Sequence, residues 1–309
     1  MVYRISEPQG KSNSHMPNWD DVLREILSAP RKDSISAVRQ KYICDLHENT
    51  GRNVIAYYSG FLQRDEGSFL GINDDDINAL MNVIHGMDRS KGLDLILHTP
   101  GGSVAATEAI VEYLWSMFDR DIRAIIPQIA MSAGTMIACS CREIIMGKQS
   151  SLGPIDPQFS NIPAHGVIEE FQTAIEQISL NPDSLPIWQI ILGKYPPTFV
   201  GECQKAVEMA NEVVTDWLTG NMFLADKDAS EKAKNIVEKL TDHAKMKTHS
   251  RHISTLKCIE IGLNILKLEA DQSLQEIVLT THHAYMHTFD QTNAVKIIEN
   301  HLGKTMIRD

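Results

Sequence analysis

The order of strand-like and helix-like segments between residues 53 and 146 limits the fold more than any other feature of this chain. Short runs rich in Val, Ile, Leu and Tyr alternate with longer segments in which apolar residues have helical spacing. The strand-like runs are 53–62, 93–98, 122–128 and 143–146, and the helix-like segments are 77–84, 105–118 and 131–141. This alternation predicts parallel crossover units, so we expect an α/β fold with a mostly parallel sheet.

The segments outside this region are expected to be mainly helical. The first 18 residues are polar and predict a loose arm, and residues 19–48 have helical spacing that is interrupted at Pro30. After Pro157 the pattern favours helices at 168–180, 200–218 and 227–245, a short helix that ends at Gly262, and two more within 273–303. We therefore expect an N-terminal addition in 1–50, a core in 51–268 and a helical tail in 269–309.

Charge and cysteine content argue against several classes of protein. A net charge of −11 disfavours non-specific nucleic-acid binding, which needs a basic face. The five cysteines have no regular spacing, which suits a reducing compartment. We find no signal-peptide pattern and no apolar run of about 18 residues, so we expect a cytoplasmic protein without a membrane span. The cysteines and histidines form no metal motif, and we expect neither a metal nor a cofactor.

Two glycine turns follow predicted strands, at residues 100–103 and 132–135. Ligands of parallel sheets gather beyond the carboxyl ends of the strands, where both turns lie. Ser132 directly precedes a predicted helix, whose free N–H groups would face a developing oxyanion, and it is our candidate nucleophile. The alternative is that Ser132 only caps this helix.

The first turn contributes backbone rather than side chains. Gly101 and Gly102 permit positive φ and close approach of a substrate. The N–H of Gly102 and that of Ala133 would together form an oxyanion hole. The alternative is that these residues only form a tight strand-to-helix turn, since Pro-Gly-Gly is also common in turns without a binding role.

Three motifs in order give the chain a family resemblance. TPGGSV, IAMSAGTMIA and SSLGPIDPQ resemble the superfamily of Clp peptidases and signal peptide peptidase A, and most of all its serine dehydrogenase proteinases. The resemblance covers roughly residues 51–268. It implies a ClpP/crotonase-like spiral of ββα crossover units with helical N- and C-terminal additions, usually oligomeric. In the relatives the third motif pairs with bound peptide as an added strand, which places Gly153 and Asp156, with Gly101 and Ser103, at the substrate cleft. The alternative for Asp156 is that it only fixes the conformation of its loop.

The general base is less well defined by the resemblance. Clp peptidases use a histidine after the serine, but Asp156 stands at about that place here. Signal peptide peptidase A and its relatives use a lysine further along, just before a helix, and Lys194 fits that placement. The alternative is that Lys194 is only a solvated lysine that precedes a helix. Lys205 is the second choice, His98 is an auxiliary candidate near the glycine turn, and His165 is the nearest downstream histidine.

These expectations combine into one main function. We expect a serine peptidase with a Ser132–Lys194 dyad that cleaves peptides or unfolded segments through an acyl-enzyme, acting as a homo-oligomer. The alternative is a catalytically silent scaffold of the same fold that oligomerises and binds peptides. Acyl-CoA chemistry on the related crotonase fold is a third class, but no CoA-binding surface can be located. No P-loop is present, so an unfolding ATPase would be a separate chain.

Overall fold

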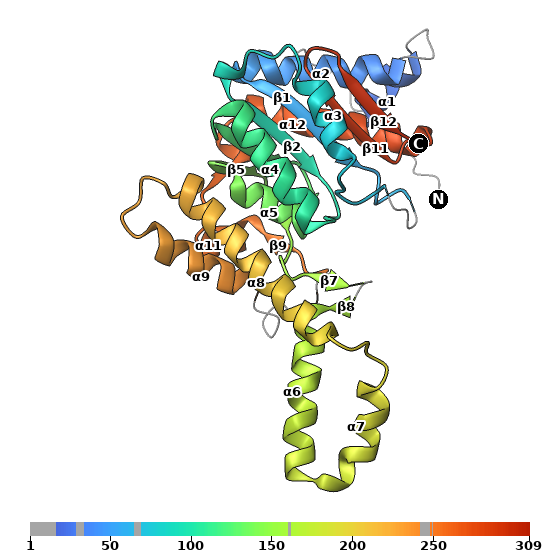
Figure 1. Ribbon diagram of the computed structural model, residues 1–309. Coiled ribbons are helices and arrows are strands. Elements are labelled where there is room, and N and C mark those ends of the chain that lie inside the picture. The colour runs from blue at the N-terminus through green and yellow to red at the C-terminus, as the bar shows by residue number, and fades with distance from the viewer. Residues whose placement is uncertain (1–16, 29–33, 65–68, 160–161, 242–247, 249) are drawn as a thin grey trace.

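A seven-stranded sheet forms the centre of the computed structural model, which describes residues 17–28, 34–64, 69–159, 162–241, 248 and 250–309 (Figure 1). Its strand order is β10-β5-β3-β2-β1-β11-β12. The first five strands in this order are mutually parallel, and β11 and β12 are antiparallel to their neighbours. The strands are β1 (Asn53–Ser59), β2 (Leu93–His98), β3 (Ile122–Ile126), β5 (Glu143–Met146), β10 (Ile265–Lys267), β11 (Lys296–Asn300) and β12 (Thr305–Arg308). The expected α/β fold with a mostly parallel sheet is confirmed.

Helices cover both faces of this sheet, which is why its strands are apolar without alternation. In β1, Ile55 and Tyr57 pack into the core that holds α3, α4 and α5, whereas Val54 and Ala56 pack into the core of α2 and α12. These helices are α2 (Ser34–Thr50), α3 (Asp76–Ile84), α4 (Val104–Phe118), α5 (Ala133–Ser140) and α12 (Gln272–Gln291). α1 (Trp19–Ser28) contacts α2 and α12, so the predicted N-terminal helices are confirmed; Pro30 lies outside the described residues.

The C-terminal segment corrects one expectation. Of the two helices predicted within 273–303, the first is α12, but the second is wrong, because residues 296–300 form strand β11 beside β1. The charged residues Lys296 and Glu299 of this segment are buried in the sheet. Lys296 pairs with Asp76, and Glu299 pairs with Arg39 of α2. Each charge has a buried partner from elsewhere in the chain, a condition that local sequence does not reveal.

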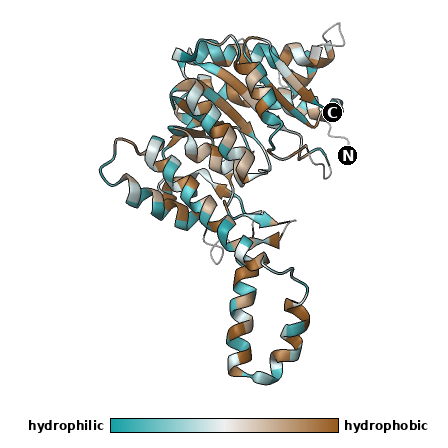
Figure 2. Cartoon of the chain, viewed as in Figure 1, coloured by the Kyte–Doolittle hydropathy of each residue, from teal (hydrophilic) through white to brown (hydrophobic). Residues whose placement is uncertain are grey.

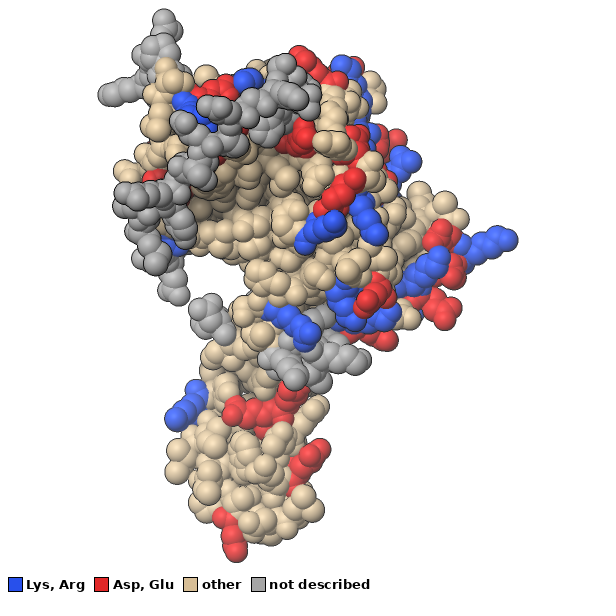
Figure 3. Space-filling view, turned by 180° about the vertical axis from the view of Figure 1, so that it is seen from behind, with Lys and Arg blue, Asp and Glu red and all other residues tan. Residues whose placement is uncertain are grey.

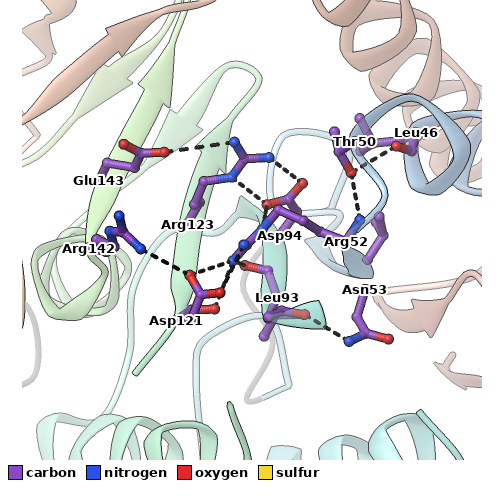
Figure 4. A network of polar contacts seen from close by, with 12 residues as sticks. Leu46, Thr50, Arg52, Asn53, Leu93, Asp94, Asp121, Arg123, Arg142 and Glu143 are labelled. Atoms are coloured by element: carbon purple, nitrogen blue, oxygen red, sulfur yellow. Dashed lines mark hydrogen bonds and ion pairs between the residues drawn. The ribbon is translucent and has the colours of Figure 1, made fainter. Parts of the chain in front are cut away.

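Ion pairs join the amino ends of the parallel strands (Figure 4). Asp94, fully buried, accepts hydrogen bonds from Arg52 Nε at 2.9 Å and from Arg123 Nε at 2.7 Å. Arg52 also binds Asp121, and this hydrogen bond lowers the pKa of the Asp121 carboxyl. The network links β1, β2 and β3 at the end opposite to the glycine turns, which leaves the carboxyl ends free for a site.

A helical arm extends from the body (Figure 1). It contains α6 (Ala164–Leu180), α7 (Leu185–Leu192) and the start of α8 (Phe199–Trp217), which returns to the body. Figure 2 shows hydrophobic residues along the arm, and several are exposed, with Leu180 at 87% and Ile190 at 70%. The predicted helices at 168–180 and 200–218 are thereby confirmed.

Smaller elements complete the structure. A second sheet of β4 (Ile129–Ala130), β6 (Ser151–Leu152) and β9 (Ile253–Ser254) lies beside the glycine turns, and β7 (Gln158–Phe159) pairs with β8 (Ile162–Pro163) at the arm. α9 (Ala229–Thr241) and α11 (Thr255–Ile261), which ends at Gly262 as expected, contact each other. Short helical turns are η1 (Arg89–Lys91), η2 (Pro182–Ser184), η3 (Leu218–Met222) and η4 (Leu268–Ala270).

Two surface properties bear on partners. On the face seen in Figure 3, basic and acidic side chains are interspersed beside a hollow whose wall is mainly uncharged. Within the described part of the chain, no helix combines the length and the apolar content that crossing a membrane requires.

Candidate active site

Ser132 lies between β4 and α5 in a strained backbone conformation. Its φ is +51° and its ψ is −117°, which is unusual for a residue with a side chain and costs on the order of 1–3 kcal/mol. Hydrogen bonds on either side hold the turn: Met131 N–H donates to Thr99 O at 3.0 Å, and Gly134 N–H donates to Met131 O at 2.8 Å. The surrounding structure thus fixes Ser132 in a conformation that it would not adopt alone.

The hydroxyl of Ser132 makes no capping hydrogen bond to α5, although the residue occupies the N-cap position. Ser103 offers a direct comparison, because its hydroxyl does cap α4 and accepts from Ala106 N–H at 3.2 Å. The capping interpretation of Ser132 therefore has no contact to support it, and its partly exposed side chain is available for other chemistry.

The two adjacent glycines are required by close contacts. Gly101 has φ +104°, and a Cβ there would lie 2.7 Å from Ser132 Cβ. Gly102 has φ +154°, and a Cβ there would lie 2.3 Å from both N and O of Ile72. Gly134 has a side-chain neighbour instead, since a Cβ there would approach Thr99 Cγ2 to 2.5 Å. The turns hold their backbones closer together than any side chain allows.

A parallel bridge to Ile72 sets the direction of the Gly102 N–H. Ile72 N–H donates to Gly101 O at 2.7 Å, and Ser103 N–H donates to Ile72 O at 2.9 Å. In this pattern the N–H and C=O of the residue between them, Gly102, point away from Ile72. Neither this N–H nor that of Ala133 donates to an acceptor among the described residues. Two unused donors therefore accompany Ser132, one of them at the N-terminus of α5.

A pocket of about 360 Å³ brings Ser132 and the first glycine turn together. Its lining comprises Gly71, Pro100, Gly101, Gly102, Ser103, Val104, Ser132, Ile155, Pro157 and Gln158. Of the predicted cleft residues, Gly101 and Ser103 line the pocket directly. Gly153 and Asp156 are buried and do not belong to the described lining: Gly153 N–H donates to Thr135 Oγ1 at 2.9 Å, and Asp156 lies in the chain between the lining residues Ile155 and Pro157.

The described lining of this pocket contains no histidine or lysine. Lys194 is exposed and follows α7 on the arm, and Lys205 is exposed on α8, where it pairs with Glu202 at 3.1 Å. His165 lies at the start of α6, also on the arm. A single chain thus brings Ser132 and Gly102 into one pocket, with the buried Ala133 directly after Ser132, but none of the predicted bases.

His98 is enclosed in the core instead of facing the pocket. It is fully buried at the end of β2, with Nδ1 3.1 Å from Ser59 O and Nε2 3.3 Å from Gln128 Oε1. Burial lowers the pKa of His98 to about 4, and the two hydrogen bonds oppose this shift only in part. The residue is a neutral part of the core at physiological pH.

Sequence reasoning missed part of the wall. Gly71 and Ile72 come from the segment between β1 and α3, and they hold the first glycine turn from outside. Their one local signal is a glycine shortly before the acidic, cap-rich start of α3.

Among the described residues there is no group of three or more His, Cys, Asp or Glu side chains placed to hold a metal ion.

Comparisons with known proteins agree with this geometry. Residues 26–303 match the model of a family described as ClpP-like SDH-type serine proteinase. Two proteins of Methanocaldococcus jannaschii, both described as uncharacterized, are similar to this chain. One is 31% identical over 234 residues, covering 74% of this chain and 71% of its own length. The other is 30% identical over 227 residues, covering 74% and 70%.

Proposed function

Because the chain belongs to the ClpP-like SDH-type serine proteinases, we propose that it is a serine peptidase with Ser132 as its nucleophile. The observation that carries the proposal is a strained serine with an uncapped hydroxyl that shares a pocket with Gly102 and directly precedes Ala133. Neither the Gly102 N–H nor the Ala133 N–H has an acceptor among the described residues. Strain of this kind is maintained where it presents a reactive group.

The reaction proceeds through an acyl-enzyme. Ser132 Oγ attacks the carbonyl carbon of the scissile peptide, and its proton passes to the base while the oxyanion accepts from Gly102 N–H and Ala133 N–H. The C–N bond then breaks, and the leaving amine takes the proton from the base. Water, deprotonated by the same base, hydrolyses the ester and restores Ser132.

The substrate is a peptide or an unfolded protein segment. The pocket is lined by the first glycine turn and by Ile155, Pro157 and Gln158 of the third motif. A lining without charged side chains among the described residues suits a substrate strand, which gains affinity from main-chain hydrogen bonds.

Lys194 remains the proposed base. In one chain it lies on the arm, outside the pocket, so this role requires the arm to move or a second copy to supply the lysine. The exposed apolar residues of the arm support assembly into a homo-oligomer. All five cysteines are free and four are buried, which supports a reducing, cytoplasmic location.

Hydrolysis of a quenched-fluorescent peptide library tests the enzyme and its base together. Ser132→Ala should abolish hydrolysis. Lys194→Met should lower kcat by about 100-fold or more, without changing stability because the side chain is exposed. Lys205→Met is the matched control on the same arm and should leave kcat unchanged. Equal activity of Lys194→Met and the parent protein would refute the lysine assignment.

A silent scaffold is the second candidate, and the pocket lining without a histidine or lysine favours it. In that case Ser132→Ala would not change peptide binding, and the parent protein would hydrolyse none of the library. Measurement of both properties on the same preparations separates the two functions.

A further inference from the structure

We propose that Lys296, a buried residue of β11, orients and polarises the Gly102 N–H through two peptide groups joined in series. The inference rests on the proposed function, because it concerns the oxyanion donor assigned there. Lys296 does not touch the substrate in this account; it is a positioning residue.

The contacts form one continuous chain. Lys296 Nζ donates to Gly71 O at 2.8 Å. The same peptide group carries the Ile72 N–H, which donates to Gly101 O at 2.7 Å. The peptide group of Gly101 O in turn carries the Gly102 N–H. In a trans peptide the C=O and N–H point in opposite directions, so the two dipoles are aligned from the ammonium to the oxyanion hole.

A buried cluster holds the ammonium in place. Lys296 Nζ lies 2.8 and 2.9 Å from the two oxygens of Asp76. Asp76 also accepts from Tyr57 Oη at 2.7 Å and from Asn73 N–H at 3.1 Å. Lys296, Asp76 and Tyr57 are 2%, 4% and 3% exposed. The position of the charge is therefore fixed from α3 and β1 as well as from β11.

The hydrogen-bond count explains why Lys296 is not itself a base. An ammonium has three donors, and all three find acceptors here: one on Gly71 and two on Asp76. Burial lowers the pKa of Lys296, and Asp76 opposes this shift. The side chain lies behind Gly71, which lines the pocket, and does not reach the lining itself.

The physical effect follows from burial. A charge in a low-dielectric interior polarises a hydrogen-bonded peptide more strongly than one in water, and successive hydrogen bonds strengthen one another. Buried ion pairs contribute little net stability, since apolar side chains of similar volume often replace them without loss. Fold stability alone is therefore a weak reason for an ammonium at this place, whereas alignment of an oxyanion donor is a specific one.

The test compares two buried ion pairs that share strand β11. In Lys296→Met/Asp76→Asn, both charges next to the glycine turn are removed together, so no unpaired charge remains buried. Arg39→Met/Glu299→Gln removes the other pair, whose atoms are 2.7 Å apart and equally buried, but which makes no contact with Gly71 or Ile72. It is the matched control for loss of a buried pair.

The probe is a fluorophosphonate, which needs no knowledge of the natural substrate. Ser132 Oγ bonds to phosphorus, the P–F bond breaks, fluoride leaves, and the serine proton goes to the base or water. The phosphoryl oxygen occupies the oxyanion hole. We expect the maximal rate of phosphonylation to fall about tenfold in Lys296→Met/Asp76→Asn, with the concentration for half-maximal rate unchanged. The control should stay within about twofold of the parent protein.

A second readout does not depend on reaction. In the parent protein the Gly102 amide proton should resonate downfield in a glycine-labelled NMR spectrum, and it should move upfield in Lys296→Met/Asp76→Asn but not in the control. Lys296→Arg, which keeps a buried donor, should retain most of the rate.

The outcomes separate this inference from the proposed function. Unchanged rate and unchanged Gly102 shift in Lys296→Met/Asp76→Asn would overturn the inference alone. Equal slowing in both double variants would also overturn it, because the cause would then be general loosening of β11. A parent protein that never reacts with the probe would refute the proposed function, and the inference with it.

Discussion

Replacing Gly102 by alanine tests whether the first glycine turn builds the oxyanion hole. The new Cβ would lie 2.3 Å from N and O of Ile72, and both are backbone atoms that cannot rotate away. The bridge must open, which removes two hydrogen bonds of 2.7 and 2.9 Å, worth about 1 kcal/mol each net. Positive φ adds about 1–3 kcal/mol of strain, so we expect a total loss of about 3–5 kcal/mol in the free energy of unfolding.

The effect on reaction should be separable from this loss of stability. Displacement of one oxyanion donor should slow fluorophosphonate labelling of Ser132 by about 100- to 1000-fold at a temperature where the variant is folded. Gly86→Ala is the matched control: Gly86 has φ +91°, but nothing lies within 4 Å of the added Cβ. It should cost about 1–2 kcal/mol and leave labelling unchanged. Stability is measured by urea unfolding, and the labelling rate is measured by quenching the fluorophosphonate reaction at a series of times. If Gly102→Ala were labelled as fast as the parent protein, the assignment of the Gly102 N–H to the oxyanion hole would be refuted.

Three further predictions concern stability. Ser132→Gly should abolish labelling yet raise the free energy of unfolding by about 1 kcal/mol, because glycine relieves the strain at φ +51°; a lower urea midpoint would contradict this. Asp94→Asn should lower the free energy of unfolding, measured with urea, by about 3 kcal/mol, because Arg52 and Arg123 lose their shared buried carboxylate. Labelling of Ser132 should persist, because this network lies at the opposite end of the strands. Burial lowers the pKa of His98 from its ordinary 6.5 to about 4, so the unfolded chain binds the proton more readily; the stability contributed by the neutral ring is complete above pH 6.5 and is lost as the pH falls towards 4. Between pH 7 and pH 4, the free energy of unfolding of His98→Gln should therefore fall by about 3 kcal/mol less than that of the parent protein. Parallel pH profiles of the two proteins in urea unfolding would contradict this assignment.

Much of the fold follows from local pattern. The buried strands 93–98 and 122–126 are short, apolar and bounded by turns, and the helices between them have clear spacing. The prediction of Ser132, Gly101 and Gly102 as site residues has a similar basis, because a glycine turn at the carboxyl end of a parallel strand permits close approach at the place where ligands bind.

What the sequence did not predict depends on distant partners. Strand β11 lies in a segment for which a helix was predicted, and its buried charges depend on Asp76 and Arg39, which lie beside Lys296 and Glu299 only in the fold. Gly71 joins the pocket only because β1 lies next to β2 in the sheet. The position of the general base could not be predicted for a similar reason. The spacing of Lys194 along the chain does not determine where the helical arm places it relative to Ser132.

Mass-spectrometric mapping of the fluorophosphonate adduct tests the central claim most directly. The parent protein should carry one adduct, on the peptide that contains Ser132, and Ser132→Ala should carry none. Ser103 is the internal comparison, since it lines the same pocket but its hydroxyl caps α4. An adduct on Ser103 or another serine, or no adduct on a folded parent protein, would contradict the assignment of Ser132 as the nucleophile.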